Sequence, residues 1–369
     1  MMRLPLFQFR APRTIEEAAH ILAGEGPAAM PIAGGTDLLP NMKRRQQVPK
    51  TLMSLRHIEP LTHMYFQKQF SRLGACVTLA EIASSFRNGF TALAQAASQV
   101  ATPQIRNMAT LGGNLCLDTR CNYYDQNYEW RKAIDFCLKK DGTVCWVAPG
   151  SPKCMAVSST DTAPALIALG ARVRLVSSAE IREVPLADLY NNDGLDYIKR
   201  RPDEILAEIL LGNPHGWRST YWKLRRRGSF DFPVLSVAAA VRFSASGAAS
   251  GRPSDSLSSP ISGSTHGSES AIVEDARIVI GSAASRPLVA TEAAKFLIGR
   301  PLTAETIAEV ATQAAKIAKP LDNTDFDLSW RKKVTAAFVS YALRELAGQD
   351  VRSERQSITR LTPPFPILL

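Results

Sequence analysis

Two segments decide the fold: ATPQIRNMATLGGNLC at residues 101–116 and SSTDTAPALIALGA at residues 158–171. In the first, the small-residue turn 110–114 (TLGGN) lets backbone N–H groups approach a bulky or anionic ligand, because glycine has no Cβ. The residues between the two segments carry four cysteines with the spacing C-x15-C-x7-C-x8-C, namely Cys121, Cys137, Cys145 and Cys154. Four thiolates are the ligand set of an iron–sulfur cluster. A glycine turn that can bind a cofactor, with a cysteine-rich segment directly after it, therefore suggests two redox centres held close together.

Composition narrows the class of protein. The chain has 369 residues, of which 45% are hydrophobic and 21% charged, values typical of a globular protein with two or three domains. No apolar run approaches the roughly 20 residues of a membrane span. The N-terminal MMRLPLFQFRAPRT lacks the apolar region of a signal peptide, so we expect a cytoplasmic protein without membrane contact.

The formal net charge of +10 lies partly in short basic clusters at 43–45, 199–201 and 225–227. Such clusters bind nucleic acid in some proteins, but no recognition motif accompanies them here. We therefore expect solvated faces or docking sites for acidic subunits, and no nucleic-acid partner.

The N-terminal part predicts a helix followed by a strand and a glycine turn. Thr14 and Glu17 have the spacing of a capping box, and the apolar residues after them follow a helical face. A short apolar strand at 28–33 then runs into Gly34-Gly35-Thr36-Asp37. Strand followed by Gly-Gly-Thr is typical of a phosphate cradle, although it is neither a P-loop nor a Rossmann G-x-G-x-x-G. A plain hairpin turn is the alternative.

The remaining pattern predicts an α+β chain of two domains. Strands alternate with short helices as far as about residue 212, which indicates a first domain over 1–216, built in two lobes and carrying the cysteine segment 117–157. The second domain, 217–347, is expected to contain a three-stranded antiparallel sheet (221–226, 235–243, 276–280) followed by three helices (290–298, 304–318, 327–346). Segment 244–270 is rich in Ser and Gly, which predicts a disordered loop. Residues 348–369 are expected to form a tail.

These segments together resemble the FAD subunit of the xanthine oxidase (molybdenum hydroxylase) family. The resemblance rests on PIAGGTDLL at 31–39, QIRNMATLGGN at 104–114 and Asp161 in STDTAP, with RPDEILAEIL at 201–210 and YWKLRRR at 221–227. It extends over residues 1 to about 347. It implies a two-lobed FAD-binding domain of the PCMH (VAO-like) type, followed by a smaller domain like that of CO dehydrogenase flavoproteins.

The resemblance also assigns FAD-binding residues. It places the loop 32–38 around the pyrophosphate, the turn 110–114 as a second wall, Asp161 at the ribityl or adenosine side, and Val100, Leu206 and Lys223 beside the flavin. Leu206 could instead be an ordinary core residue, and Lys223 an exposed lysine on a strand. The full set is Ile32, Ala33, Gly34, Gly35, Thr36, Asp37, Leu38, Val100, Thr110, Leu111, Gly112, Gly113, Asn114, Asp161, Leu206 and Lys223.

Most members of that family lack the cysteine segment. Its presence here resembles the 4-hydroxybenzoyl-CoA reductases of the same family, whose beta subunit holds an extra [4Fe–4S] cluster on four insertion cysteines. Zinc is the rival ligand, but structural zinc sites usually pair their cysteines as C-x2–4-C, and no histidine lies in the segment. Cys116 is a spare ligand, although the family pattern favours Cys121. Cys76, in an apolar strand, is expected to be inert core.

The chain lacks the cysteine run of a [2Fe–2S] ferredoxin and has no room for a molybdopterin domain, so we expect an electron-transfer subunit of an oxidoreductase. The resemblance implies FAD and [4Fe–4S] cofactors and a molybdopterin-containing large subunit. It also implies a small subunit with two [2Fe–2S] clusters, all in a dimer of heterotrimers. Electrons would pass from ferredoxin through [4Fe–4S] and FAD to the partners, for reductive dehydroxylation of 4-hydroxybenzoyl-CoA in anaerobic aromatic degradation.

Two alternatives stay open at this point. One is the FAD subunit of another molybdenum hydroxylase, of xanthine or aldehyde dehydrogenase type, which passes electrons to NAD or another acceptor. The other is a zinc-stapled binding module without enzymatic function, in which the glycine turns are plain turns.

Overall fold

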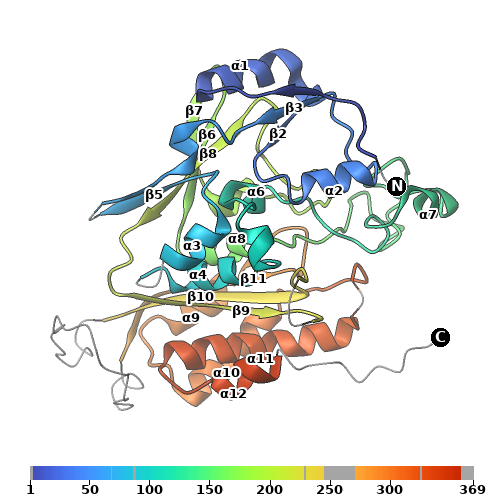
Figure 1. The fold of residues 1–369 in the computed structure, drawn as a ribbon. Helices are drawn as coiled ribbons and strands as arrows, with labels where there is room; N and C mark the ends of the chain where they lie inside the picture. Colours follow the sequence, from blue (N-terminus) through green and yellow to red (C-terminus); the bar gives the residue numbers. More distant parts are fainter. Residues whose placement is uncertain are drawn as a thin grey trace.

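The computed structural model describes residues 3–67, 69–85, 89–227, 230–244, 271–324 and 326–358. The described chain forms three sheets stacked from the N-terminal to the C-terminal part of the molecule, with α1 above them and most of the other helices between and below them (Figure 1). The segment predicted to be a disordered loop, 244–270, lies outside these residues apart from Ser244, as does the end of the predicted tail, 359–369.

The first lobe is built on a parallel sheet in the order β1-β3-β2. Its strands are β1 (Gln8–Arg10), β2 (Ala29–Ile32) and β3 (Thr51–Ser54). The predicted cap of α1 (Ile15–Glu25) is present: Oγ1 of Thr14 accepts a hydrogen bond from the Glu17 N–H at 3.1 Å, an interaction of about 1 kcal/mol. Helix α1 buries Ala18 and Leu22 in a core that also includes residues of the second lobe, so the two lobes share a core.

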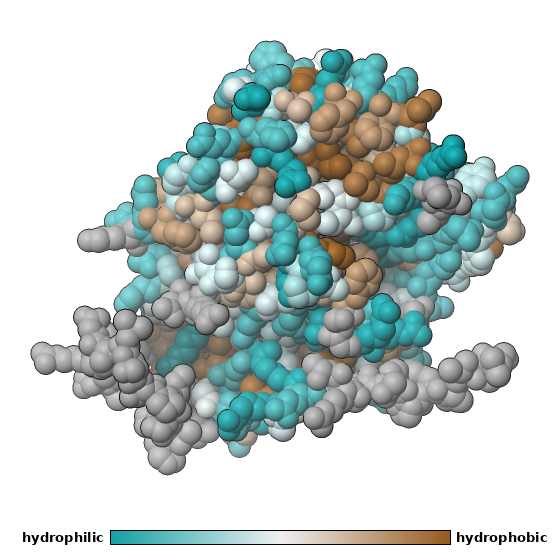
Figure 2. Space-filling model, viewed as in Figure 1, coloured by the Kyte–Doolittle hydropathy of each residue, from teal (hydrophilic) through white to brown (hydrophobic). Residues whose placement is uncertain are grey.

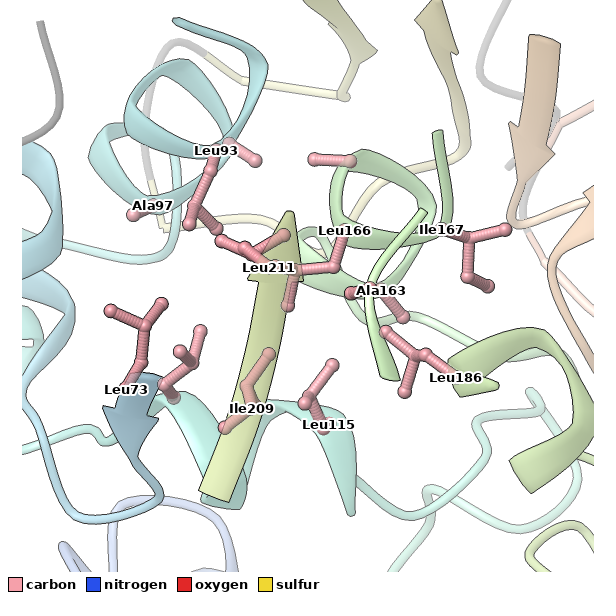
Figure 3. Packing of buried hydrophobic residues seen from close by; sticks show 14 of the residues in the cluster. Leu73, Leu93, Ala97, Leu115, Ala163, Leu166, Ile167, Leu186, Ile209 and Leu211 are labelled. Carbon is pink, nitrogen blue, oxygen red and sulfur yellow. The ribbon is translucent and has the colours of Figure 1, made fainter. Parts of the chain in front are cut away.

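The second lobe contains an antiparallel sheet in the order β4-β5-β8-β6-β7. Its strands are β4 (Met64–Phe66), β5 (Phe70–Gly74), β6 (Arg172–Val176), β7 (Ile181–Pro185) and β8 (Ile205–Gly212). Four helices pack here: α3 (Leu79–Ser85), α4 (Thr91–Ser98), α6 (Leu111–Leu115) and α8 (Thr162–Ala168). Figure 3 shows Leu166 of α8 pointing toward Leu211 of β8, with Leu93 of α4 close by.

Helix α8 explains the apolar segment after Asp161. Every residue of this helix, TAPALIA, is buried, because the helix lies between the second lobe and the C-terminal sheet. There it contacts β10 (Leu235–Phe243) and β11 (Val273–Gly281). A helix that is apolar on all sides is stable only in such a position. The segment that decided the sequence interpretation is therefore the central helix of the molecule.

The C-terminal domain has an antiparallel sheet in the order β12-β11-β10-β9. Its strands are β9 (Trp217–Leu224), β10 (Leu235–Phe243), β11 (Val273–Gly281) and the short β12 (Leu288–Val289). The helices α9 (Thr291–Leu297), α10 (Ala304–Ala315), α11 (Leu328–Leu346) and α12 (Arg352–Ile358) follow. The α+β class with a PCMH-type domain and a C-terminal sheet-and-helix domain is thus confirmed. Strand β12 and helix α12 add to the three strands and three helices predicted.

The cysteine segment is a loop closed at its base. Arg120 and Val157 exchange two backbone hydrogen bonds, N–H to O at 2.8 and 2.7 Å, and we call this pair the neck. Beyond the neck the only described helix is α7 (Tyr128–Ala133), which lies at the right edge of the molecule in Figure 1. The loop is held by the C-terminal domain, since the Asn122 N–H donates to Asn323 O at 3.2 Å and Asn323 Nδ2 donates to Met155 O at 2.7 Å.

Arg331 of α11 stabilises the loop that carries Asn323. Its guanidinium is buried and donates to the carbonyls of Leu321 at 2.9 Å, Val234 at 3.2 Å and Ser282 at 2.7 Å. It also reaches Asn323 Oδ1 at 3.3 Å. Burial lowers the pKa of Arg331 to about 10. One arginine therefore joins the ends of two strands to the loop that supports the cysteine segment.

In the part of the chain that the structure describes, no helix is long and apolar enough to span a bilayer.

Candidate functional site

A cleft of about 450 Å³ lies where the two lobes meet the C-terminal domain. The loop after β2 forms one wall and the turn 110–114 forms another; residues of β8 and the segment 230–232 complete it. On the face drawn in Figure 2, hydrophobic side chains gather in the upper half, over the three-stranded sheet of the first lobe. We refer to the space of about 450 Å³ as the cleft.

Gly34 of the first turn packs against the backbone just before the second turn. A Cβ on Gly34 would lie 1.9 Å from the carbonyl oxygen of Met108, a distance that no side chain tolerates. Gly35 has φ +69°, in the left-handed region that favours glycine. In the second turn, a Cβ on Gly112 would lie 2.6 Å from the Cβ of Ala75. Gly34 is therefore required to bring the two walls together, and Gly112 lets the second wall pack closely against Ala75.

The second turn also holds the segment that returns from the cysteine loop. Thr110 caps α6, with Oγ1 accepting from the Gly113 N–H at 3.2 Å. Asn114 Oδ1 accepts three hydrogen bonds, from Thr160 Oγ1 at 2.8 Å and from the Thr162 backbone N–H and Oγ1 at 3.1 and 2.7 Å. Asn114 thus positions the start of α8, and with it Asp161 in the cleft wall.

Asp161 belongs to a buried ion pair. Its carboxylate accepts from Lys223 Nζ at 3.0 Å and from the Tyr221 hydroxyl at 2.6 Å, and the Lys223 ammonium also donates to Gln99 O at 3.0 Å. Burial raises the pKa of Asp161, an effect that Lys223 opposes, and burial lowers the pKa of Lys223. Lys223 itself does not line the cleft; it lies behind Asp161 and holds the carboxylate in place.

Arg120, from the neck of the cysteine segment, reaches into the same cleft. Its guanidinium pairs with Asp37 of the first glycine turn and with Asp125 at 3.1 Å, and it lies 4.7 Å from the ring centroid of Phe232. Its buried Nε has no hydrogen-bond partner in the described chain. The cysteine segment therefore contributes a cation to the cleft wall.

Two residues at the mouth of the cleft have strained backbones. Ala101 has φ 42° and Phe230 has φ 73°, both in the left-handed region that costs non-glycine residues free energy. The Phe230 N–H donates to Ala101 O at 3.3 Å, so the strained positions face each other. Such strain is common at ligand sites.

The four segment cysteines line a second, smaller space, which we call the cysteine cavity. Cys121, Cys137, Cys145 and Cys154 are all buried there, with Tyr124 and Lys139 among the other lining residues. The volume of the cysteine cavity is about 10 Å³ with the thiols in these positions. No three His, Cys, Asp or Glu side chains among the described residues are arranged to hold a single metal ion.

The surroundings of these thiols bear on what they can bind. Burial raises the pKa of the Cys121 thiol to about 12 and that of Cys154 to about 11. Cluster and metal ligands are thiolates, so the cavity favours them only when a cationic centre compensates the charge. Cys116 lies apart from this group, in the wall of the cleft. Cys76 also borders the cleft; burial raises its pKa to about 12, in keeping with an inert thiol.

Known families account for nearly the whole chain. Residues 5–214 match the family described as "FAD binding domain in molybdopterin dehydrogenase", and residues 219–346 match "CO dehydrogenase flavoprotein C-terminal domain". The chain belongs to the molybdopterin dehydrogenase FAD-binding family. It is thus the FAD-binding, oxidoreductase subunit of a molybdenum hydroxylase-type enzyme, and FAD is its cofactor.

Individual relatives agree with this membership. The chain is 27% identical over 310 residues to the nicotinate dehydrogenase FAD-subunit of Eubacterium barkeri, which covers 82% of each chain. It is 31% identical over 258 residues to the aldehyde oxidoreductase FAD-binding subunit PaoB of Escherichia coli, covering 65% of this chain and 79% of the relative. The structure of carbon monoxide dehydrogenase from Hydrogenophaga pseudoflava superposes with a TM-score of 0.70 at 24% identity, over 93% of this chain and 98% of that chain.

The residues predicted to bind FAD fall mostly in one place. All of them line the cleft except Leu111, which is buried in the core, and Lys223, which lies behind Asp161. The glycine turns, Asp161, Val100 and Leu206 come together as expected, and the hairpin-turn reading of residues 34–37 fails, since α2 (Leu38–Lys43) follows at once.

Sequence reasoning missed several lining residues. Arg120 carried no signal, because it lies in the segment assigned to the cysteines. Tyr197 and Arg200, from the connection before β8, also line the cleft, and so do Phe230 and Phe232. The spacing of the two phenylalanines in FDFP was the one available sign of an aromatic rim.

Proposed function

We propose that this chain is the FAD and iron–sulfur subunit of a molybdenum-dependent reductase of the 4-hydroxybenzoyl-CoA reductase type. One observation carries the proposal: four cysteines spread over residues 121–154 line a single buried cavity beside the FAD cleft. Four buried thiols without a histidine suit a [4Fe–4S] cluster, which distributes its charge over four irons. When bound, the cluster would supply one-electron transfer.

The residues of the cleft support FAD binding as predicted. The backbone of residues 32–38 and 110–114 would hold the pyrophosphate, and Asp161, held by Lys223, would accept hydrogen bonds from hydroxyl groups of the cofactor. Val100 and Leu206 would contact the flavin. The thiols of Cys121, Cys137, Cys145 and Cys154 would hold the cluster.

The proposed reaction is carried out with partner chains. A reduced low-potential donor of the ferredoxin class would pass electrons through the cluster and FAD to a small subunit with two [2Fe–2S] clusters and a molybdopterin-containing large subunit, in a dimer of heterotrimers. The overall change is 4-hydroxybenzoyl-CoA plus two electrons and two protons, giving benzoyl-CoA and water. The hydroxyl oxygen leaves as water and the ring carbon gains hydrogen.

Metal and sulfide content tests the cluster directly. The chain purified without oxygen should contain about four iron atoms and four acid-labile sulfides per FAD, and little zinc. Cys145→Ser should lose the iron and retain FAD, because Cys145 lines the cysteine cavity and not the cleft. Cys116→Ser is the matched control and should keep the iron. Zinc in place of iron would support the alternative of a zinc-stapled binding module. Loss of iron from Cys116→Ser would instead place Cys116 among the cluster ligands.

The holoenzyme separates the two redox alternatives. Supplied with reduced ferredoxin and 4-hydroxybenzoyl-CoA, it should form benzoyl-CoA. The relatives named for nicotinate and aldehyde substrates favour the second candidate, a molybdenum hydroxylase that oxidises its substrate and reduces NAD or another acceptor. Dye-linked oxidation of an aldehyde or N-heteroaromatic compound, without reduction of the thioester, would establish that candidate and overturn the first.

The neck makes the relay itself testable. Because Arg120 and Val157 are paired, residues 121–156 can be replaced by Asn-Gly, the preferred two-residue hairpin connection. Arg120 is retained since it pairs with Asp37. The shortened holoenzyme should keep dye-linked oxidation and lose ferredoxin-driven reduction. Unchanged ferredoxin-driven turnover would reduce the cluster to a structural support.

A further inference from the structure

A thin polar partition separates the cysteine cavity from the cleft. Lys139 lines the cysteine cavity but not the cleft, whereas Asp118 lines the cleft but not the cysteine cavity. The two side chains meet, with Lys139 Nζ 2.8 Å from Asp118 Oδ1. A single ion pair therefore extends from one wall to the other, with its positive end at the thiols and its negative end at the cleft.

The cation of this pair is immobile. Lys139 Nζ has three donors, and all three are used: Asp118 Oδ1 at 2.8 Å, Thr119 Oγ1 at 2.8 Å and Gly194 O at 2.6 Å. The ammonium also lies 4.9 Å from the ring centroid of Tyr124. Its side chain is 5% exposed, so solvent screens its charge little.

The anion is equally fixed. Asp118 Oδ2 accepts from the Tyr124 hydroxyl at 2.9 Å and from Gln47 Nε2 at 3.3 Å. Its Oδ1 accepts from the Thr119 N–H at 2.9 Å as well as from Lys139. The carboxylate side chain is 6% exposed. Burying two charges is costly and is compensated only by such complete hydrogen bonding.

We propose that the Asp118–Lys139 pair sets the reduction potentials of the two centres relative to each other. The inference rests on the proposed cluster and FAD sites. A cation at the cysteine cavity stabilises an added electron there and raises that potential, while an anion at the cleft opposes reduction of the flavin and lowers its potential. In the proposed relay electrons pass from the cluster to the flavin, so the cluster has the lower reduction potential. The pair therefore brings the two potentials closer, and electrons reach the flavin with little loss of reducing power.

Charge-removing variants give opposite signs. Asp118→Asn should raise both potentials, the flavin more than the cluster. Lys139→Met should lower both, the cluster more than the flavin. At a fixed applied potential, each change should shift the oxidised-to-reduced ratio of the nearer centre at least tenfold, equal to 59 mV for a one-electron couple. Lys140→Met is the matched control: this neighbouring lysine pairs with Asp141 at 3.3 Å, is 35% exposed, and should shift neither.

The measurement is a potentiometric titration of the holoenzyme, following the flavin by absorbance and the cluster by electron paramagnetic resonance, after iron and FAD have been quantified. If the wild-type protein contains no iron, the proposed cluster site is refuted, whereas the effect of the Asp118–Lys139 pair on the flavin potential is still measured. The double variant Asp118→Asn/Lys139→Met keeps a neutral partition and should widen the gap between the potentials. If iron is lost from these variants, Asp118→Asn in the iron-free Cys145→Ser background should still raise the flavin potential. No shift, or shifts of one sign in both single variants, would overturn the proposal.

Discussion

Removing Lys223 should expose the cost of the buried carboxylate behind the cleft. In Lys223→Met the Asp161 carboxylate keeps the Tyr221 hydroxyl at 2.6 Å but loses the ammonium at 3.0 Å. Both partners of this ion pair are almost fully buried, at 0% and 3% exposed. Breaking such a pair by removing one partner costs about 3–5 kcal/mol. The unfolding entropy is about 2.1 cal/mol/K per residue, or about 0.8 kcal/mol/K for this chain of 369 residues, so Tm should fall by roughly 4–7 °C.

The control is an ion pair of the same length at the surface. Lys295 Nζ lies 3.0 Å from Glu292 Oε1, with the side chains 64% and 82% exposed. Lys295→Met should therefore cost less than about 1 kcal/mol, since exposed pairs are screened by water. Both variants are compared with wild type by thermal unfolding followed by circular dichroism, and FAD retention is measured in parallel. Lys223→Met should also lose part of its FAD.

The pH dependence gives the sign of the effect. Burial raises the pKa of Asp161, so its ionised form is the costly one in the folded state. Protonation at low pH removes the unpaired charge, and the penalty of Lys223→Met should shrink as the pH falls and be largest at neutral pH and above. The reasoning would be refuted by equal Tm changes in Lys223→Met and Lys295→Met, or by a penalty that grows on acidification.

Two further predictions concern backbone contacts. Gly34→Ala should lose FAD, because its Cβ would lie 1.9 Å from Met108 O and force the two walls of the cleft apart. Gly24→Ala is the control and should keep FAD, because nothing lies within 4 Å of the new Cβ. Flavin absorbance per chain measures both variants, and full flavin occupancy in Gly34→Ala would contradict the predicted contact. Arg331→Met should destabilise the chain by several times the roughly 1–3 kcal/mol of one unsatisfied buried group, since four acceptors lose their donor. Its exposed neighbour serves as control, because Lys332→Met should leave Tm within error, and similar Tm values for the two variants would show that the carbonyls find other partners.

Much of the fold was readable from periodicity. Strand β10 has the predicted bounds 235–243, because its sequence is mostly apolar and its first seven residues are all buried. Strand β7 was missed, since IREVP alternates exposed and half-buried residues and has no apolar face to detect. Strand β1 was missed for a similar reason: all three of its residues are exposed.

The site was predictable where glycine and spacing carry it, and not elsewhere. The turns at 34–37 and 110–114 are local signals, and the structure joins them as expected. The pairing of Arg120 with Asp37 joins residues 83 apart in sequence, and no local pattern encodes such a contact. The position of Lys223 behind Asp161 depends on how β9 packs on α8, which the sequence pattern of either element leaves open.

The neck has a consequence for the local stability of the cysteine segment. Because the backbones of Arg120 and Val157 are hydrogen-bonded to each other, the two ends of the segment are held together independently of the residues between them. Proteins open locally in cooperative units, and the neck marks the boundary of one such unit. Local opening of the segment beyond the neck is therefore expected to leave the cleft walls on either side of it in place.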